Sequence, residues 1–133
     1  MARIYKIPLL FTLSFILILA NFMKATELNQ LKAFLSEQRK VVITTHKGPD
    51  GDAMGSSLAL YNYLLKKGHS VQVITPNDYP RFLKWMKGDD GVIEYSFHEE
   101  KAKKITESAE LIFCLDFNTL SRIDTYAPIG ESS

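Results

Sequence analysis

Cysteine is almost absent from this sequence of 133 residues, because Cys114 is the only one. A single cysteine cannot form an intramolecular disulfide, so the fold must depend on apolar burial, and a reducing compartment suits it best. An excess of one charge sign is also lacking: 16 basic and 15 acidic residues leave a formal net charge of +1. This balance gives no support for binding a polyanion through net charge alone.

What is present is the composition of one ordinary globular domain. Hydrophobic residues make up 46% of the chain, aromatic residues 11% and charged residues 23%. These fractions argue against a disordered chain, a collagen-like chain and a multi-domain enzyme.

The first 22 residues form an apolar extension that differs from the rest of the chain. A short basic segment, 1–6, precedes the apolar run 7–20, which is the pattern of a signal peptide. The run is short for a membrane span, which takes about 20 apolar residues, and Ile18 stands where cleavage favours a small residue. The second interpretation is that translation starts at Met23 and that residues 1–22 are a mis-assigned start. The second interpretation predicts a cytoplasmic protein, whereas the first predicts export or membrane anchoring through residues 1–22.

Residues 23–133 alternate predicted strands and helices. Apolar, mostly β-branched runs predict buried strands, and these lie at 41–45, 71–75, 92–97 and 111–115. Amphipathic spacing predicts helices at 26–40, 53–67 and 99–109. A further helical turn is predicted to place Phe82, Trp85 and Met86 in the core. This order favours an α/β fold with a parallel sheet flanked by helices.

Several single residues receive local structural roles from their positions. Thr26 is expected to cap its helix, and Gly68 is expected to end the helix at 53–67 in a left-handed conformation. His69 and His98 are interpreted as solvated loop residues. Cys114, inside an apolar run, is interpreted as a small buried hydrophobe.

The loop after strand 41–45 carries residues suited to cation binding. Asp50 and Asp52 are two apart, so in an extended segment both carboxylates point to one side, and His46 lies at the end of the strand. Asp116 follows the last apolar strand, and ligands bind at the carboxyl ends of strands in such sheets. Three carboxylates and one imidazole suit Mn²⁺ or Mg²⁺ better than a thiolate-seeking metal. The N–H groups of the helix that begins near Ala53 are expected to attract a phosphate to the same place.

This set of residues fits a two-metal phosphoryl site, in which ions about 3.5–4 Å apart activate water and neutralise the attacked phosphate. A structural alternative stands beside it, because Asp-Gly-Asp before a helix also forms a turn with an N-cap, and a lone Asp at a strand end is common. The joint occurrence of four such residues at the carboxyl ends of strands favours the metal site.

Two segments resemble motifs of the DHH-family phosphoesterases. Residues 41–60 (VVITTHKGPDGDAMGSSLAL) resemble the family's first motif, in which His-x-x-x-Asp-x-Asp follows the first strand. Residues 111–122 (LIFCLDFNTLSR) resemble the second motif, an apolar strand that ends in a metal-bridging Asp. The resemblance is to the small oligoribonuclease and 3′-phosphoadenosine-5′-phosphate phosphatase type, and it extends from Met23 to Asp124.

The resemblance implies roles for particular residues. His46 and Asp50 would hold one Mn²⁺, Asp52 would hold a second, and Asp116 would bridge the two, with Mg²⁺ as the other candidate ion. The implied reaction is hydrolysis of phosphate esters by metal-activated water, with short oligonucleotides, nucleoside bisphosphates or linear dinucleotides, and no duplex nucleic acid, as substrates. Asn118 and Arg122 are expected beside the site as supporting or phosphate-contacting residues, with a helix-start Asn and a surface Arg as the alternative.

The sequence departs from the family pattern beyond these two motifs. The namesake Asp-His-His motif, the later metal-binding Asp and the C-terminal substrate-binding domain do not occur in it. Residues 23–133 therefore resemble the front half of a DHH catalytic domain, C-terminally truncated, and we expect little or no turnover from this polypeptide alone. A non-catalytic metal- or nucleotide-binding fragment and one half of a split enzyme are the alternatives. We also expect an exposed sheet edge and apolar helix faces that favour self-association or a complementing C-terminal half.

A haloacid-dehalogenase-type phosphatase is the remaining interpretation. In that family, Asp50 and Asp52 would be the pair of catalytic aspartates. The first Asp would then stand directly at the strand end, whereas here the loop after His46 intervenes, so this interpretation ranks below the others.

Overall fold

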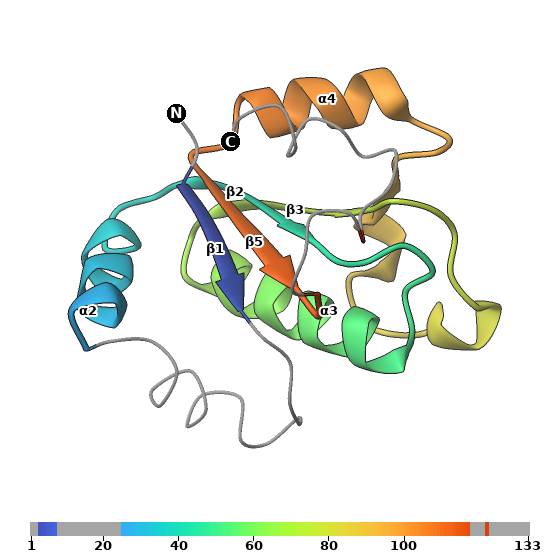
Figure 1. Ribbon diagram of the computed structural model, residues 1–133, viewed down its shortest axis with the longest axis horizontal. Helices are drawn as coiled ribbons and strands as arrows, with labels where there is room; N and C mark the ends of the chain where they lie inside the picture. The colour runs from blue at the N-terminus through green and yellow to red at the C-terminus, as the bar shows by residue number, and fades with distance from the viewer. Residues whose placement is uncertain (1–2, 8–24, 118–121, 123–133) are drawn as a thin grey trace.

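The protein is a five-stranded parallel sheet with helices on both faces (Figure 1). The computed structural model describes residues 3–7, 25–117 and 122. The strands are β1 (Arg3–Ile7), β2 (Lys40–Thr44), β3 (Ser70–Thr75), β4 (Ile93–Glu94) and β5 (Leu111–Leu115), in the order β1-β5-β2-β3-β4. The helices are α2 (Ala25–Phe34), α3 (Gly51–Lys66) and α4 (Glu99–Glu107), with 3₁₀ turns η1 (Arg81–Leu83) and η2 (Asp89–Gly91). The predicted α/β fold is confirmed.

Alternate residues of the strands face two separate cores. On one face Val41 and Ile43 of β2 pack with Met54 and Leu58 of α3. On the other face Val42 packs in a second cluster with apolar residues of β3, β5 and α4. Because both faces are covered, β5 is buried along its whole length and β2 at every residue except Lys40, which is why these two strands read as continuous apolar runs. Cys114 is fully buried in the second cluster, as predicted.

Strand β1 was not predicted from the sequence. It pairs in parallel with β5, from Arg3 opposite Leu111 to Ile7 opposite Leu115. β1 covers the edge of β5, so β1 and β4 are the outer strands of the described sheet. The expected self-association stays a prediction. A short strand at the edge of a sheet is held by backbone hydrogen bonds, which leave no periodic pattern of side chains in the sequence. The basic and apolar N-terminal residues therefore did not indicate a strand. Residues 8–24, which include all of the apolar run except Ile7, lie outside the described residues. Within the described ranges, no helix is both long and apolar enough to cross a membrane.

The prediction that Phe82, Trp85 and Met86 lie in the core is wrong for the two aromatic residues and confirmed for Met86. Phe82 and Trp85 are 74% and 80% exposed, whereas Leu83 is buried and Met86 packs against the core on the α3 face. The reason is that the chain turns here through hydrogen bonds between residues three apart, from the N–H of Leu83 to Pro80 and from that of Met86 to Leu83, so Leu83 and Met86 share the inner side. The predicted α-helical spacing placed the outer pair in the core.

Some element boundaries also differ from the prediction. Pairing of β4 with β3 is limited to Ile93 and Glu94, since β3 ends before Pro76, which has no N–H to continue a ladder. Helix α2 begins before Thr26, which therefore lies inside the first turn rather than at the cap, and ends at Phe34, well before the predicted end. Gly68 has a φ of 90°, which confirms the left-handed end of α3.

The two histidines predicted to be solvated behave differently. His98 is exposed, as predicted. His69 is buried, and its Nδ1 accepts a hydrogen bond of 3.2 Å from the backbone N–H of Arg39. A contact between residues 30 apart cannot be read from local sequence, so the prediction for His69 is wrong.

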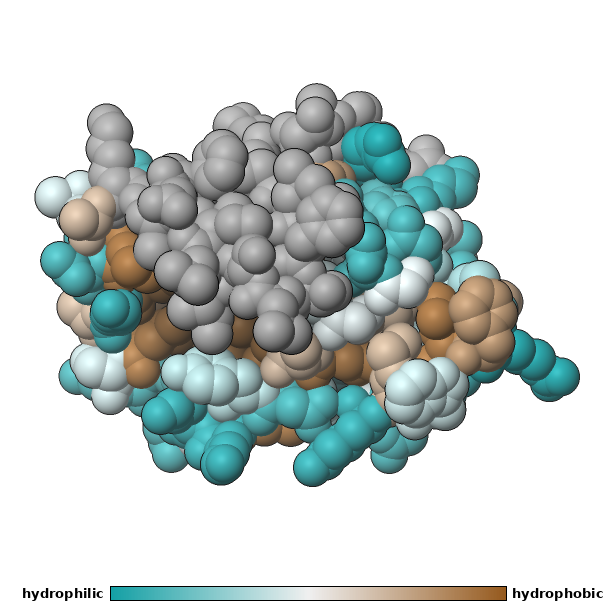
Figure 2. Space-filling model, turned by 90° about the horizontal axis from the view of Figure 1, so that it is seen from below, coloured by the Kyte–Doolittle hydropathy of each residue, from teal (hydrophilic) through white to brown (hydrophobic). Residues whose placement is uncertain are grey.

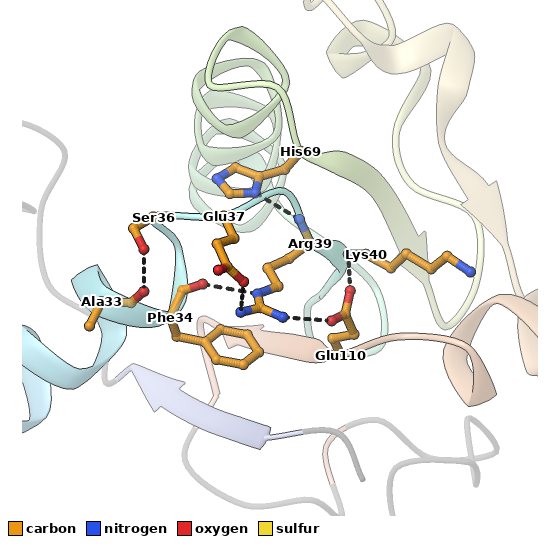
Figure 3. Close-up of polar contacts among 8 residues, drawn as sticks. All are labelled: Ala33, Phe34, Ser36, Glu37, Arg39, Lys40, His69 and Glu110. Carbon is orange, nitrogen blue, oxygen red and sulfur yellow. Dashed lines mark hydrogen bonds and ion pairs between the residues drawn. The ribbon is translucent and has the colours of Figure 1, made fainter.

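Arg39 joins three elements at the amino end of the sheet (Figure 3). Its Nε donates to the carbonyl of Phe34 at 3.0 Å, and its guanidinium lies 4.3 Å from the ring centroid of Phe34. Its other two nitrogens pair with Glu110 at 3.0 Å and Glu37 at 2.9 Å. Glu110 also accepts from the backbone N–H of Lys40 at 2.9 Å, and this bond, together with Arg39, holds the pKa of Glu110 below its usual range. The cluster ties α2, β2 and the start of β5 together.

We expect Arg39→Ala to lower the free energy of unfolding by about 1–3 kcal/mol, because it removes two part-buried hydrogen bonds and the packing on Phe34. Urea unfolding followed by far-UV circular dichroism measures the change. Glu37→Ala is the matched control, since it removes only an exposed partner of the same guanidinium, and it should leave the unfolding midpoint nearly unchanged. Equal losses in the two variants would contradict this assignment.

Replacing two of the glycines by alanine should change the free energy of unfolding in opposite directions. Gly88 has a φ of 97°, and a Cβ there would lie 2.8 Å from Cε1 of Tyr61. We expect Gly88→Ala to lower the free energy of unfolding by about 1–3 kcal/mol. Gly55 lies inside α3, and a Cβ there would have nothing within 4 Å, so Gly55→Ala should raise that free energy by about 0.5–1 kcal/mol. Thermal unfolding of both variants checks the pair, and shifts of the same sign would refute it.

Candidate metal centre

Three side chains meet at the carboxyl edge of the sheet. Strands β2 and β5 are neighbours, so the loop after β2 and the residue after β5 start from the same edge. His46 Nε2 lies 3.4 Å from Asp116 Oδ2 and 3.9 Å from Asp50 Oδ2. One ligand atom from each of these residues lies within 4.8 Å of the others. The fold therefore brings together residues that are far apart in the chain.

His46 is held with one ring nitrogen toward the two acids. Its side chain is only 8% exposed, and Nδ1 lies 2.8 Å from the carbonyl of Lys47. A proton on Nδ1 donates to that carbonyl, which leaves the lone pair of Nε2 directed at the carboxylates. This is the tautomer that a metal-binding histidine requires.

The loop that carries His46 is fixed by contacts at two points. The backbone N–H of Lys47 donates to the carbonyl of Arg122 at 2.8 Å, and that of Gly48 donates to Oδ1 of Asn77 at 2.7 Å. Gly48 has a φ of 65°, a conformation that glycine adopts without strain. Asn77 was not identified from the sequence. The signal available was its position just past the carboxyl end of β3, beside Pro76.

Asp50 has two tasks, one for each carboxylate oxygen. Its Oδ1 accepts from the backbone N–H groups of Asp52 at 3.1 Å and Ala53 at 3.0 Å, so Asp50 is the N-cap of α3. Its Oδ2 is the oxygen that lies toward His46. The structural alternative, an N-cap, therefore coexists with the metal-site geometry. Two of the N–H groups at the start of the helix are therefore taken by the cap. The expected attraction of a phosphate to this place stays a prediction.

Asp116 is buried and adopts an unusual backbone conformation. It has a φ of 64°, the left-handed region that residues other than glycine rarely enter, and its side chain is 7% exposed. Burial raises the pKa of its carboxyl, His46 lowers it, and the charges of Asp50 and Asp52 raise it. A strained residue with a buried carboxyl between other acids is typical of a functional site.

The donor set fits a divalent cation. An imidazole nitrogen and two carboxylate oxygens are ligands that Mn²⁺ accepts, and Mg²⁺ binds carboxylates in the same way. A cation at this place would also neutralise the mutual repulsion of the acids around Asp116. The residues present therefore fit the metal centre predicted from the sequence.

The other predicted site residues take separate positions. Asp52 is exposed in the first turn of α3 and lies outside the three-residue group, although its charge acts on Asp116. Arg122 is exposed, and its backbone carbonyl holds the loop of His46 through Lys47. Asn118 lies outside the described residues.

Comparisons with known proteins identify the family of this chain and two proteins similar to it. Residues 40–131 match the family described as DHH family, N-terminal domain. The chain is similar to a curated protein of Thermus thermophilus, the bifunctional oligoribonuclease and PAP phosphatase NrnA, with 37% identity over 83 residues; the match covers 62% of this chain and 23% of that protein. It is also similar to the crystal structure of an exopolyphosphatase-related protein from Bacteroides fragilis, with a TM-score of 0.75 and 41% identity. That match covers 79% of this chain and 31% of the solved chain.

The haloacid-dehalogenase-type interpretation does not survive these findings. Asp50 caps α3 instead of standing at the end of β2, and the family match covers both of the motifs on which the DHH resemblance depends. The parallel sheet, the three converging ligand atoms and the matched residues lead to one conclusion: the chain belongs to the DHH family, whose N-terminal domain it carries over residues 40–131.

Proposed function

We propose that this chain provides a cation position of a Mn²⁺-dependent phosphoesterase centre that acts on short oligonucleotides or nucleoside bisphosphates. The observation that carries the proposal is the convergence of His46, Asp50 and Asp116 within 4.8 Å. The substrate class is supported by the name of the Thermus thermophilus relative, an oligoribonuclease and PAP phosphatase. Cys114, the buried and only cysteine of this chain, and the proposed nucleotide substrates favour a cytoplasmic location.

The residues of the chain prepare the site in three ways. The carbonyl of Lys47 orients the ring of His46, the N-cap geometry orients Asp50, and the left-handed backbone orients Asp116. A divalent cation bound between them would supply a water of lowered pKa and would neutralise charge on the phosphate. Since the ligand side chains are held before binding, little ordering entropy is lost when the cation enters.

We expect this chain by itself to bind one cation and to show little or no turnover. Among the described residues, one group of three ligands is assembled around His46, and Asp52 lies outside that group. A second ion would need donors in addition to Asp52 and the shared Asp116. Binding of a cation is therefore expected to be much easier to detect than hydrolysis.

Calorimetric titration with Mn²⁺ and Mg²⁺ tests the cation site, with one ion per chain as the expected stoichiometry. Product formation from a dinucleotide and from adenosine 3′,5′-bisphosphate, followed by chromatography in the presence of Mn²⁺, tests the reaction. Absence of any cation uptake would overturn the proposal. Sustained hydrolysis that Asp116→Ala abolishes would establish the activity and refute the expectation of little or no turnover. Binding of cation and dinucleotide with no product is the result expected of the non-catalytic alternative.

A further inference from the structure

Two large aromatic side chains, Phe82 and Trp85, are left in solvent. They have the highest exposed fractions of the large hydrophobic residues within the described part of the chain. Apolar side chains reach the surface at the right-hand end in Figure 2, the end at which η1 lies in Figure 1. Phe82 lies in η1 and Trp85 lies two residues beyond its end, and both side chains lie in solvent while Leu83 between them is buried. An exposed aromatic pair of this kind indicates a binding surface.

The backbone beneath the two rings is firmly held. Leu83, between them in sequence, is buried against the core. The hydroxyl of Tyr79 donates to Asp89 at 2.6 Å, and Lys84 bridges Asp78 at 2.7 Å and Glu94 at 3.1 Å. The outward direction of Phe82 and Trp85 is therefore built into the fold rather than a consequence of a loose loop.

The aromatic pair stands beside the metal centre. Leu83 Cδ2 would lie 3.9 Å from a Cβ at Gly51, the residue that follows the ligand Asp50. Asn77, in the same connection between β3 and β4, holds the loop of His46 through Gly48. In Figure 1 the yellow segment that contains η1 lies next to the N-terminal end of α3. A molecule with a phosphate at the metal centre could therefore extend over η1.

We propose that Phe82 and Trp85 form an aromatic platform on which a base of the substrate stacks while its phosphate lies at the His46–Asp50–Asp116 group. The location of the phosphate rests on the proposed function. Single-stranded nucleotides present flat faces of any base, and aromatic side chains bind them by stacking without selecting a sequence. The exposed Arg81 beside the pair adds a positive charge suited to the sugar-phosphate backbone. The platform contributes binding of short oligonucleotides in preference to phosphates that have no base.

The experiment uses the fluorescence of Trp85, which is the only tryptophan of the chain. The full chain with Mn²⁺ is titrated with the 5′-phosphorylated diadenylate pApA and, separately, with ribose 5-phosphate, which has no base. We expect pApA to quench Trp85 and ribose 5-phosphate to leave its emission unchanged. Phe82→Ala should raise the Kd for pApA by about 5- to 150-fold, the worth of one stacked base. Phe82→Tyr, which keeps a ring, should restore most of the affinity.

Tyr63→Ala is the matched control. It removes an exposed ring about 18 Å along α3 from Gly51, the first residue of the helix, and should not alter binding. Binding of pApA without quenching, and with an unchanged Kd in Phe82→Ala, would overturn the platform and leave the proposed function intact. Quenching that persists unchanged in Asp116→Ala would support the platform and count against the proposed function. The platform is overturned if the wild-type chain does not bind pApA, either by fluorescence or by calorimetry. It is also overturned if the chain associates with itself, Phe82→Ala abolishes that association, and pApA has no effect.

Discussion

Asp116→Ala is expected to raise the Kd for Mn²⁺ by more than about 100-fold, the largest effect that we expect from any single substitution. Residues that merely support a metal ligand are worth about 10–100-fold in affinity, so loss of a ligand should exceed that range. Asp116 is also the carboxyl that the fold places deepest in the site, within 3.4 Å of His46 Nε2. Calorimetric titration of the purified chain with Mn²⁺ measures the change.

Two further variants separate loss of the ligand from loss of the fold. Asp116→Asn removes the charge and keeps a side chain that tolerates the left-handed conformation, so it should remain folded by circular dichroism and still bind Mn²⁺ poorly. Asp90→Ala removes an exposed acid of η2 and should leave the affinity unchanged. A folded Asp116→Asn variant with the affinity of the wild type would show that this carboxyl is not a ligand.

Asp50→Asn and Asp50→Ala are expected to differ in stability and to agree in metal binding. Asparagine keeps an oxygen that can accept from the N–H groups of Asp52 and Ala53, so the N-cap of α3 is retained. Alanine removes the cap and should lower the free energy of unfolding by about 1 kcal/mol. Both variants lose the charged oxygen toward His46, and each should weaken Mn²⁺ binding by more than about 10-fold.

The pair distinguishes a cap from a ligand because each role has its own readout. Thermal unfolding without metal measures the cap, and calorimetric titration measures the ligand. Mn²⁺ affinity that is unchanged in Asp50→Asn would leave Asp50 with the structural role alone. A normal unfolding temperature in Asp50→Ala would mean that the cap contributes little to the fold.

The metal centre was predictable from the sequence to a large extent. His46 and Asp116 follow apolar runs, and the rule that carboxyl ends of parallel strands meet at one edge is enough to bring them together. Asp50 was predictable as well, because it lies in the loop between that edge and a helix. Asp52 was placed in the same group from a two-residue spacing that holds only in an extended segment, whereas the structure puts it in the first turn of α3.

The segment around η1 was not predictable in the same way. The spacing of Phe82, Trp85 and Met86 suits an α-helix, and large aromatic residues favour the core. The chain forms a 3₁₀ turn at 81–83 instead, whose hydrogen bonds join residues three apart. Of the three residues predicted in the core, only Met86 packs against it. The proposed platform therefore emerges only in three dimensions.

By itself the sequence determined the α/β class, the order of strands and helices along 23–117 and the candidate ligands, because local periodicity and strand ends are properties of neighbouring residues. Tertiary structure alone decided which strands are neighbours in space, and so placed β1 beside β5 and His69 against Arg39. It also decided which carboxylate oxygen of Asp50 caps a helix and which lies toward His46. These choices depend on contacts between residues far apart in the chain, whose energies no local pattern records.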